Sequence, residues 1–127
     1  MNLGRYVGSP YRFPAGCWDL VVRVYAEQLG IALPSYSAWL AEHSERHEYA
    51  AKIAEESDAW AEVPKGQERP GDVVLLRMHG LPSHVGVVAE PGRFLHAVPG
   101  TSACLERYRD AAWARRVVGF YRHRAAA

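Results

Sequence analysis

The 127-residue chain carries a net charge of +1, with 49% hydrophobic and 23% charged residues, which is ordinary for a globular protein. Its length is that of one domain with a single modest core, so we expect one domain over residues 1–127. The near-neutral charge excludes a general binder of nucleic acid or of membrane surfaces, because such proteins usually show a basic excess. No apolar run approaches 18 residues, and we therefore expect no integral membrane association.

The N-terminal segment "MNLGRYVGSPYRFPAG" has no apolar stretch after Arg5, so we expect no signal peptide and synthesis in a cytoplasm. The chain has two cysteines, Cys17 and Cys104. A reducing compartment disfavours a structural disulfide between them, and we expect both thiols to be free.

In chain order, "GSPYRFPAG" predicts an ordered loop with turns. An amphipathic helix follows from Cys17 to Leu29, because apolar residues recur there at steps of three and four, and Gly30 provides its stop. Residues 36–62 form a second helical region by the same pattern, with Trp39 and Trp60 near one face.

After this region the period becomes strand-like. Short β-branched or aromatic runs, separated by Gly and Pro, are "DVVLLRM", "HVGVVA", "RFLHAV", "ACLERY" and "RVVGFYRH". Helices followed by a run of closely spaced strands indicate an α+β domain with an antiparallel sheet.

Two histidines fall in neighbouring strands of this sheet, His84 at the start of one and His96 in the next. A three-residue loop over 90–92, with Gly92 in a left-handed conformation, would oppose Gly86 to His96 and bring both imidazoles to one face. A two-residue loop would send them to opposite faces.

Cys17 stands where a helix begins, and the helix dipole and the free N–H groups there favour a thiolate. A neighbouring imidazole would complete its activation, and a third polar group would orient that imidazole. Cys17, His84 and His96 supply these parts as nucleophile, base and orienting group. Backbone N–H groups at the helix start would serve as oxyanion donors.

Simpler interpretations of these residues exist. A free cysteine at the start of an amphipathic helix is often only a packed core residue, and we assign that structural role to Cys104. His79, His84 and His96 are conceivable metal ligands, but the sequence shows no zinc-site spacing. We expect no metal and no cofactor.

The runs "GSPYRFPAGCWDLVVRVYAEQLGIALPSY", "RPGDVVLLR" and "SHVGVVAEPGRFLHA" resemble the NlpC family of papain-like cell-wall cysteine peptidases. The resemblance leaves out only the helical insert at 36–62. The ending "VVGFYRH" is similar to the phage-tail-associated type. The resemblance implies a papain-like fold with the cysteine helix packed on the sheet. It also implies Cys17 as nucleophile, His84 as base and His96 as third member.

Two departures from the family pattern concern substrate binding. The family's common members have Asp-Cys-Ser, whereas Gly16 precedes Cys17 here and Trp18 follows it, at a position able to narrow the site. The family also places a tyrosine hydroxyl near the oxyanion. Motif matching nominates Tyr11 for this role and distance from the cysteine nominates Tyr6; we favour Tyr11.

The resemblance implies a cysteine endopeptidase that cuts peptidoglycan stem peptides between γ-D-glutamyl and the diamino acid. It further implies a virion component of a phage or prophage tail, with other tail proteins as partners. Two alternatives are a catalytically silent structural tail-tip protein and an acyltransferase or amidase toxin on the same fold.

Overall fold

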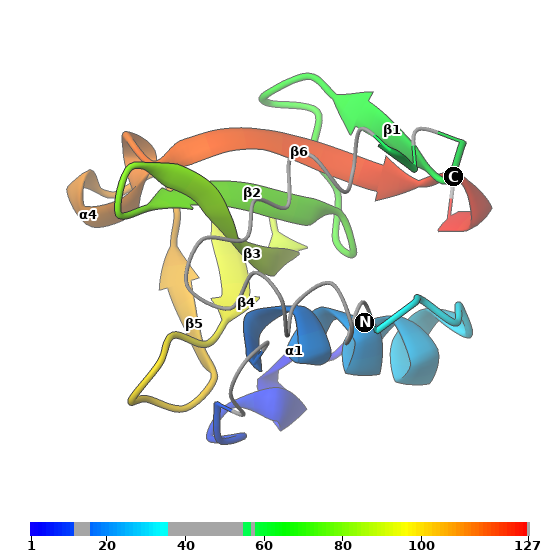
Figure 1. Ribbon diagram of the computed structural model, residues 1–127, viewed down its shortest axis with the longest axis horizontal. Helices are drawn as coiled ribbons and strands as arrows, with labels where there is room; N and C mark the ends of the chain where they lie inside the picture. Colours follow the sequence, from blue (N-terminus) through cyan, green and yellow to red (C-terminus); the bar gives the residue numbers. More distant parts are fainter. Residues whose placement is uncertain (12–15, 36–54, 57, 127) are drawn as a thin grey trace.

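A six-stranded antiparallel sheet forms the body of the protein, in the strand order β1-β6-β2-β3-β4-β5 (Figure 1). The computed structural model describes residues 1–11, 16–35, 55–56 and 58–126. The strands are β1 (Trp60–Val63), β2 (Val73–Met78), β3 (Leu81–Glu90), β4 (Arg93–His96), β5 (Cys104–Arg107) and β6 (Val117–His123). The helical elements are η1 (Gly4–Tyr6), α1 (Gly16–Val24), the π-helical turn η2 (Tyr25–Leu29), α4 (Ala111–Ala114) and η3 (Arg124–Ala126). The predicted α+β fold is confirmed.

Helix α1 packs along one face of the sheet and contacts β3 (Figure 1). Its apolar residues recur at steps of three and four, so Cys17, Val21 and Val24 all reach the same buried cluster. Each fully buried Val contributes about 1.5–3 kcal/mol to folding. The helical segment ends where the sequence predicts, because Gly30 takes a left-handed conformation with a φ of 66°.

The other face of the sheet carries a second apolar cluster. Its members come from β1, β2, β3, β4, β6 and the segments beside α4, namely Val63, Val74, Leu76, Val88, Phe94, Tyr108, Val117 and Phe120, with Trp113 packed against them. Both faces of the sheet are therefore covered. Among the described residues, no helix has the length and apolar character needed to cross a bilayer.

The helical insert predicted over 36–62 is wrong at its C-terminal end. Trp60–Val63 is strand β1, which pairs with β6 in the register Trp60↔His123 and Val63↔Phe120. Trp60 is buried against Tyr25 and His123, and this long-range packing overrides the local helical pattern. Residues 36–54 lie outside the described residues.

The hairpin between β3 and β4 closes differently from the three-residue loop that we expected. Glu90 pairs with Arg93 across a two-residue loop, and Gly92 has a φ of 99°. A register shift at Ala89 then pairs Val88 with Phe94 and Val87 with Leu95. This bulge restores the expected opposition of Gly86 to His96, so the two histidines share a face even though the loop is shorter.

Asp72 follows the tight turn at Gly71 and is almost completely buried. Its carboxylate accepts two hydrogen bonds of 2.8 Å from the Arg122 guanidinium on β6 and one from the Arg69 backbone N–H. This bidentate pair joins the start of β2 to β6. The Asp72–Arg122 pair therefore links β6 to the turn that leads into β2.

We predict that Arg122→Ala lowers the free energy of unfolding by about 2–4 kcal/mol, because the buried Asp72 carboxylate loses its charged partner. Urea denaturation followed by circular dichroism measures this change. Arg93→Ala is the matched control, since the Arg93–Glu90 pair is exposed on both sides and is worth at most about 1 kcal/mol. Equal losses for both variants would contradict the assignment.

We predict that Gly86→Ala destabilises the protein by about 1–3 kcal/mol through overpacking. A Cβ at Gly86 would lie 2.7 Å from the Leu95 carbonyl oxygen and from the Phe94 ring, and 3.1 Å from the His96 Cβ.

The matched control is Gly119→Ala in β6, where the added Cβ meets only the Tyr121 ring at 3.6 Å or more. This variant should keep wild-type stability or gain up to about 1 kcal/mol. Thermal unfolding compares the two, and a tolerated Gly86→Ala would show that the close approach of β3 and β4 is not required.

Candidate active site

A line of hydrogen bonds crosses three neighbouring strands of the sheet. His84 Nε2 on β3 lies 2.8 Å from His96 Nδ1 on β4, and His96 Nε2 lies 2.5 Å from Glu106 Oε2 on β5. Antiparallel pairing of β4 with β5 places His96 opposite Cys104, and Glu106 two residues further along β5 shares its face. The structure therefore joins the two predicted histidines and adds Glu106 to them.

The order of donors and acceptors along this line follows from its last member. A carboxylate only accepts hydrogen bonds, so His96 Nε2 carries a proton and donates it to Glu106. Neutral His96 then has an unprotonated Nδ1, which accepts from His84 Nε2–H. This leaves Nδ1 of His84 unprotonated and available as a base.

Aromatic rings enclose both imidazoles. Phe94 stacks on His96 with ring centroids 4.1 Å apart, and Trp113 lies edge-on to His96 and stacks against His84. His84 and His96 are almost completely buried. Burial lowers the pKa of His96, and the hydrogen bond to Glu106 and the charge of that carboxylate offset only part of this effect. His96 is thus held neutral, as an orienting group must be.

Cys17 lies in the first turn of α1 and is 4% exposed. It belongs to the same buried cluster as Val85 and Ala97, the residues that follow His84 and His96 in the chain. Helix α1 packs on β3, the strand that carries His84, while the two imidazoles pack against Phe94 and Trp113 of the second cluster. No disulfide joins Cys17 and Cys104, as predicted.

Tyr11 stands beside the cysteine. Burial raises the pKa of Tyr11 to about 12, with a second contribution from the negative charge of a Cys17 thiolate. The Tyr11 ring also covers Gly16, since a Cβ at Gly16 would lie only 2.5 Å from it. The side chain of Tyr11 thus occupies the space that an aspartate at position 16 would need.

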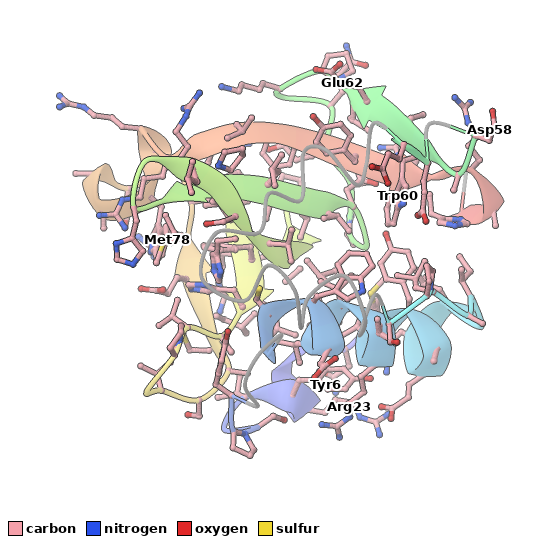
Figure 2. The ribbon with its side chains drawn as sticks, viewed as in Figure 1. Tyr6, Arg23, Asp58, Trp60, Glu62 and Met78 are labelled. Carbon is pink, nitrogen blue, oxygen red and sulfur yellow. The ribbon has the colours of Figure 1, made fainter. Side chains whose placement is uncertain are left out.

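Tyr6 and Trp18 hydrogen-bond to other parts of the chain. The Tyr6 hydroxyl donates to Glu27 at 2.8 Å, and Arg23 lies over its ring, on the side of α1 turned away from β2 and β6 (Figure 2). Glu27 is ten residues further along the helical segment than Cys17. Trp18 is buried and donates its indole N–H to the Pro34 carbonyl, which gives it a structural role.

An open groove of about 540 Å³ runs beside α1. Gly16, Asp19 and Arg23 line it from the helix, and Ala97 and Ala103 line it from the segments next to β4 and β5. The groove thus borders residues adjacent in sequence to Cys17, His96 and Cys104. It offers a carboxylate and a guanidinium to a bound polar chain.

Glu106 is the site residue that sequence reasoning missed. In the segment "ACLERY", the sequence indicates that Glu106 is a solvated residue on an edge strand. In the structure its side chain is 42% exposed. Only the register between β4 and β5 reveals its partner. One sequence pattern could have indicated it. Cys104 and Glu106 are two residues apart in a strand, so both side chains point to the same face as the side chain of the residue that pairs with Cys104.

The chain belongs to the NlpC/P60 family, whose model matches residues 6–122. Among solved structures, it is similar to a lipoprotein-like protein of the NLP/P60 family from Staphylococcus aureus, with a TM-score of 0.61 and 23% identity. The alignment covers 93% of this chain but 37% of that chain, so this protein spans little over a third of its solved relative. No curated protein matches the sequence. The family indicates a cell-wall peptidase of the cysteine type.

We predict that Glu106→Gln lowers kcat about tenfold while KM stays unchanged. Glutamine keeps a hydrogen-bond acceptor for His96 but removes the charge that fixes its tautomer, and Glu106 does not line the groove beside α1. Glu90→Gln, at the exposed end of the neighbouring hairpin, is the control and should retain wild-type kinetics. Steady-state hydrolysis of a stem peptide measures both. A rise in KM alone would assign Glu106 to substrate binding instead.

Proposed function

We propose that this protein is a cysteine endopeptidase that cleaves the stem peptides of peptidoglycan. The observation that carries the proposal is the hydrogen bond of His84 to His96, continued to Glu106, in a sheet on which the helix with Cys17 in its first turn packs. These are the parts of an activated thiol nucleophile in the order that the chemistry requires.

In the proposed reaction, His84 Nδ1 takes the proton of the Cys17 thiol, and the thiolate attacks the carbonyl carbon of the scissile amide. The imidazolium then gives this proton to the leaving nitrogen, so the C–N bond breaks and a thioester remains on Cys17. Water, deprotonated by His84, attacks the thioester. The products are a carboxylate and the free thiol.

Protonated His84 is stabilised by the remainder of the line. Its Nε2–H donates to His96 Nδ1, and Glu106 accepts from the far side of His96. Tyr11 supports the oxyanion in this scheme, together with backbone N–H groups at the start of α1. Its raised pKa of about 12 keeps the hydroxyl protonated, and therefore a donor, at neutral pH.

We propose that the groove beside α1 binds the peptide, and that the bond cut is the γ-D-glutamyl-diamino acid bond. Because Tyr11 fills the space at Gly16, a carboxylate for a substrate amine has to come from another position, and Asp19 lines the groove one turn away.

The similarity of "VVGFYRH" to the phage-tail type supports a further proposal. The protein acts as a tail-associated virion component after synthesis in the host cytoplasm.

The test is mass spectrometry of muropeptides released from purified peptidoglycan. Wild type should release new stem-peptide fragments whose termini identify the bond. Cys17→Ala should reduce the rate to below about one thousandth, because the thioester cannot form. Cys104→Ala is the matched control and should cleave at close to the wild-type rate.

Two outcomes would overturn the proposal. If wild type releases nothing and a thiol probe fails to label Cys17, the protein is a structural component that lacks the chemistry. If Cys17 is labelled but peptidoglycan stays intact, the acyl donor is of another class, and trapping the thioester with peptide and lipid donors identifies it.

A further inference from the structure

A second set of reactive groups lies at the far end of the hydrogen-bonded line. A ring nitrogen of His96, Cys104 Sγ and a Glu106 carboxylate oxygen all lie within 4.8 Å of one another, and Nε2 is the His96 nitrogen that contacts Glu106. The three residues come from adjacent strands, since His96 pairs with Cys104 and Glu106 follows two residues later on the same face. The proposed peptidase reaction uses His96 and Glu106 but gives no role to Cys104.

We propose that His96, Cys104 and Glu106 form a zinc-type metal site that switches off the catalytic cysteine when it is filled. This inference deepens the proposed function, on which its regulatory part rests. The set of imidazole, thiolate and carboxylate is one that tetrahedral Zn²⁺ accepts, with the fourth position left to water. It differs from His79, His84 and His96, the metal ligands considered from the sequence alone.

The spacing of the donors is close to that of a metal site. Ligand atoms around tetrahedral zinc lie roughly 3.3–3.8 Å apart, given bonds of about 2.0–2.3 Å. His96 Nε2 and Glu106 Oε2 would separate by about 1 Å from their present 2.5 Å, and Cys104 would close in. The Glu106 side chain is 42% exposed and Cys104 is half-buried, so an ion reaches the site from solvent without unfolding the sheet.

Filling this site reverses the hydrogen bonds described above. A metal on His96 Nε2 displaces the proton held there, and neutral His96 then carries its proton on Nδ1. That Nδ1–H faces His84 Nε2, which must become an acceptor. The single proton of neutral His84 therefore moves from Nε2 to Nδ1, the atom that has to receive the proton of Cys17.

The resulting state blocks activation in both protonation states of His84. As a neutral base it has no free Nδ1, and as an imidazolium its Nε2–H would oppose the Nδ1–H of His96. The two imidazoles keep their two protons throughout. Only the Cys104 thiol proton is released to solvent when the metal–sulfur bond forms, so the exchange balances.

The experiment has two readouts, one for binding and one for its effect. Titration with Co²⁺, which replaces zinc and is coloured, should give a thiolate-to-metal charge-transfer band and tetrahedral d–d bands. Cys104→Ser should abolish the charge-transfer band, whereas Cys17→Ala should retain it. The opposite result would place the metal on the catalytic cysteine, and absence of a band in wild type would exclude the site; each outcome overturns the proposal.

The effect on Cys17 is read by its alkylation with iodoacetamide, followed by mass spectrometry of the Cys17 peptide with and without Zn²⁺. We expect at least a tenfold slower reaction in the presence of metal, reversed by chelation. Cys104→Ser should raise the zinc concentration for half-maximal protection about 10–100-fold, with unchanged reactivity in metal-free buffer. Protection that persists in Cys104→Ser would overturn the regulatory role.

These measurements separate the two proposals from each other. The cobalt spectrum and the alkylation rate need no peptidoglycan, so they answer the question of the metal even when wild type fails to cleave. Failure of hydrolysis in metal-free buffer, with a normal cobalt spectrum, counts against the peptidase alone. Hydrolysis that Zn²⁺ leaves unchanged counts against the metal switch alone.

Discussion

The contact between His84 and His96 is the constraint on which the rest of the site depends. Two imidazoles from neighbouring strands meet at 2.8 Å only when both strands present them to the same face. The bulge at Ala89 provides this register, because the two-residue turn at Pro91 and Gly92 would otherwise shift every side chain of β3 to the other face. Gly86 permits the close approach, since its missing side chain leaves room for the Leu95 carbonyl, the Phe94 ring and the His96 Cβ.

Burial turns this contact into a chemically defined arrangement. Inside the aromatic shell of Phe94 and Trp113, the cost of an isolated charge keeps His96 neutral, so each ring nitrogen has one defined role. The half-exposed Glu106 fixes the direction of both hydrogen bonds from outside. In the proposed reaction, this geometry lets a carboxylate on an edge strand influence a cysteine on a helix. The carboxylate acts through proton positions and makes no direct contact.

The local departure from the family pattern at Gly16 has a packing explanation. Tyr11 lies on Gly16, and any larger residue at that position would displace its ring. Glycine at position 16 and the position of Tyr11 are therefore one structural feature. Because Gly16 has no side chain, the Tyr11 ring can lie on it and bring its hydroxyl near Cys17. The charged groups of the groove beside α1 all come from the helical segment, at Asp19, Arg23 and Glu27.

The sequence by itself determined the helix from Cys17 to Leu29 with its stop at Gly30, the five C-terminal strands and the family. It also favoured a common face for His84 and His96, but through a three-residue loop in place of the two-residue turn and bulge that the structure has. These features depend on the periodicity of apolar residues, on a glycine in a left-handed conformation at the end of the helix, and on motifs formed by residues close in the chain. Tertiary structure alone decided that Trp60–Val63 is a strand, because a distant partner, β6, and the ring of Tyr25 outweigh the helical pattern. It also decided that Glu106 and Cys104 join His96. The register between β4 and β5 is set by a loop whose length gives no unique pairing, so no local pattern contains it.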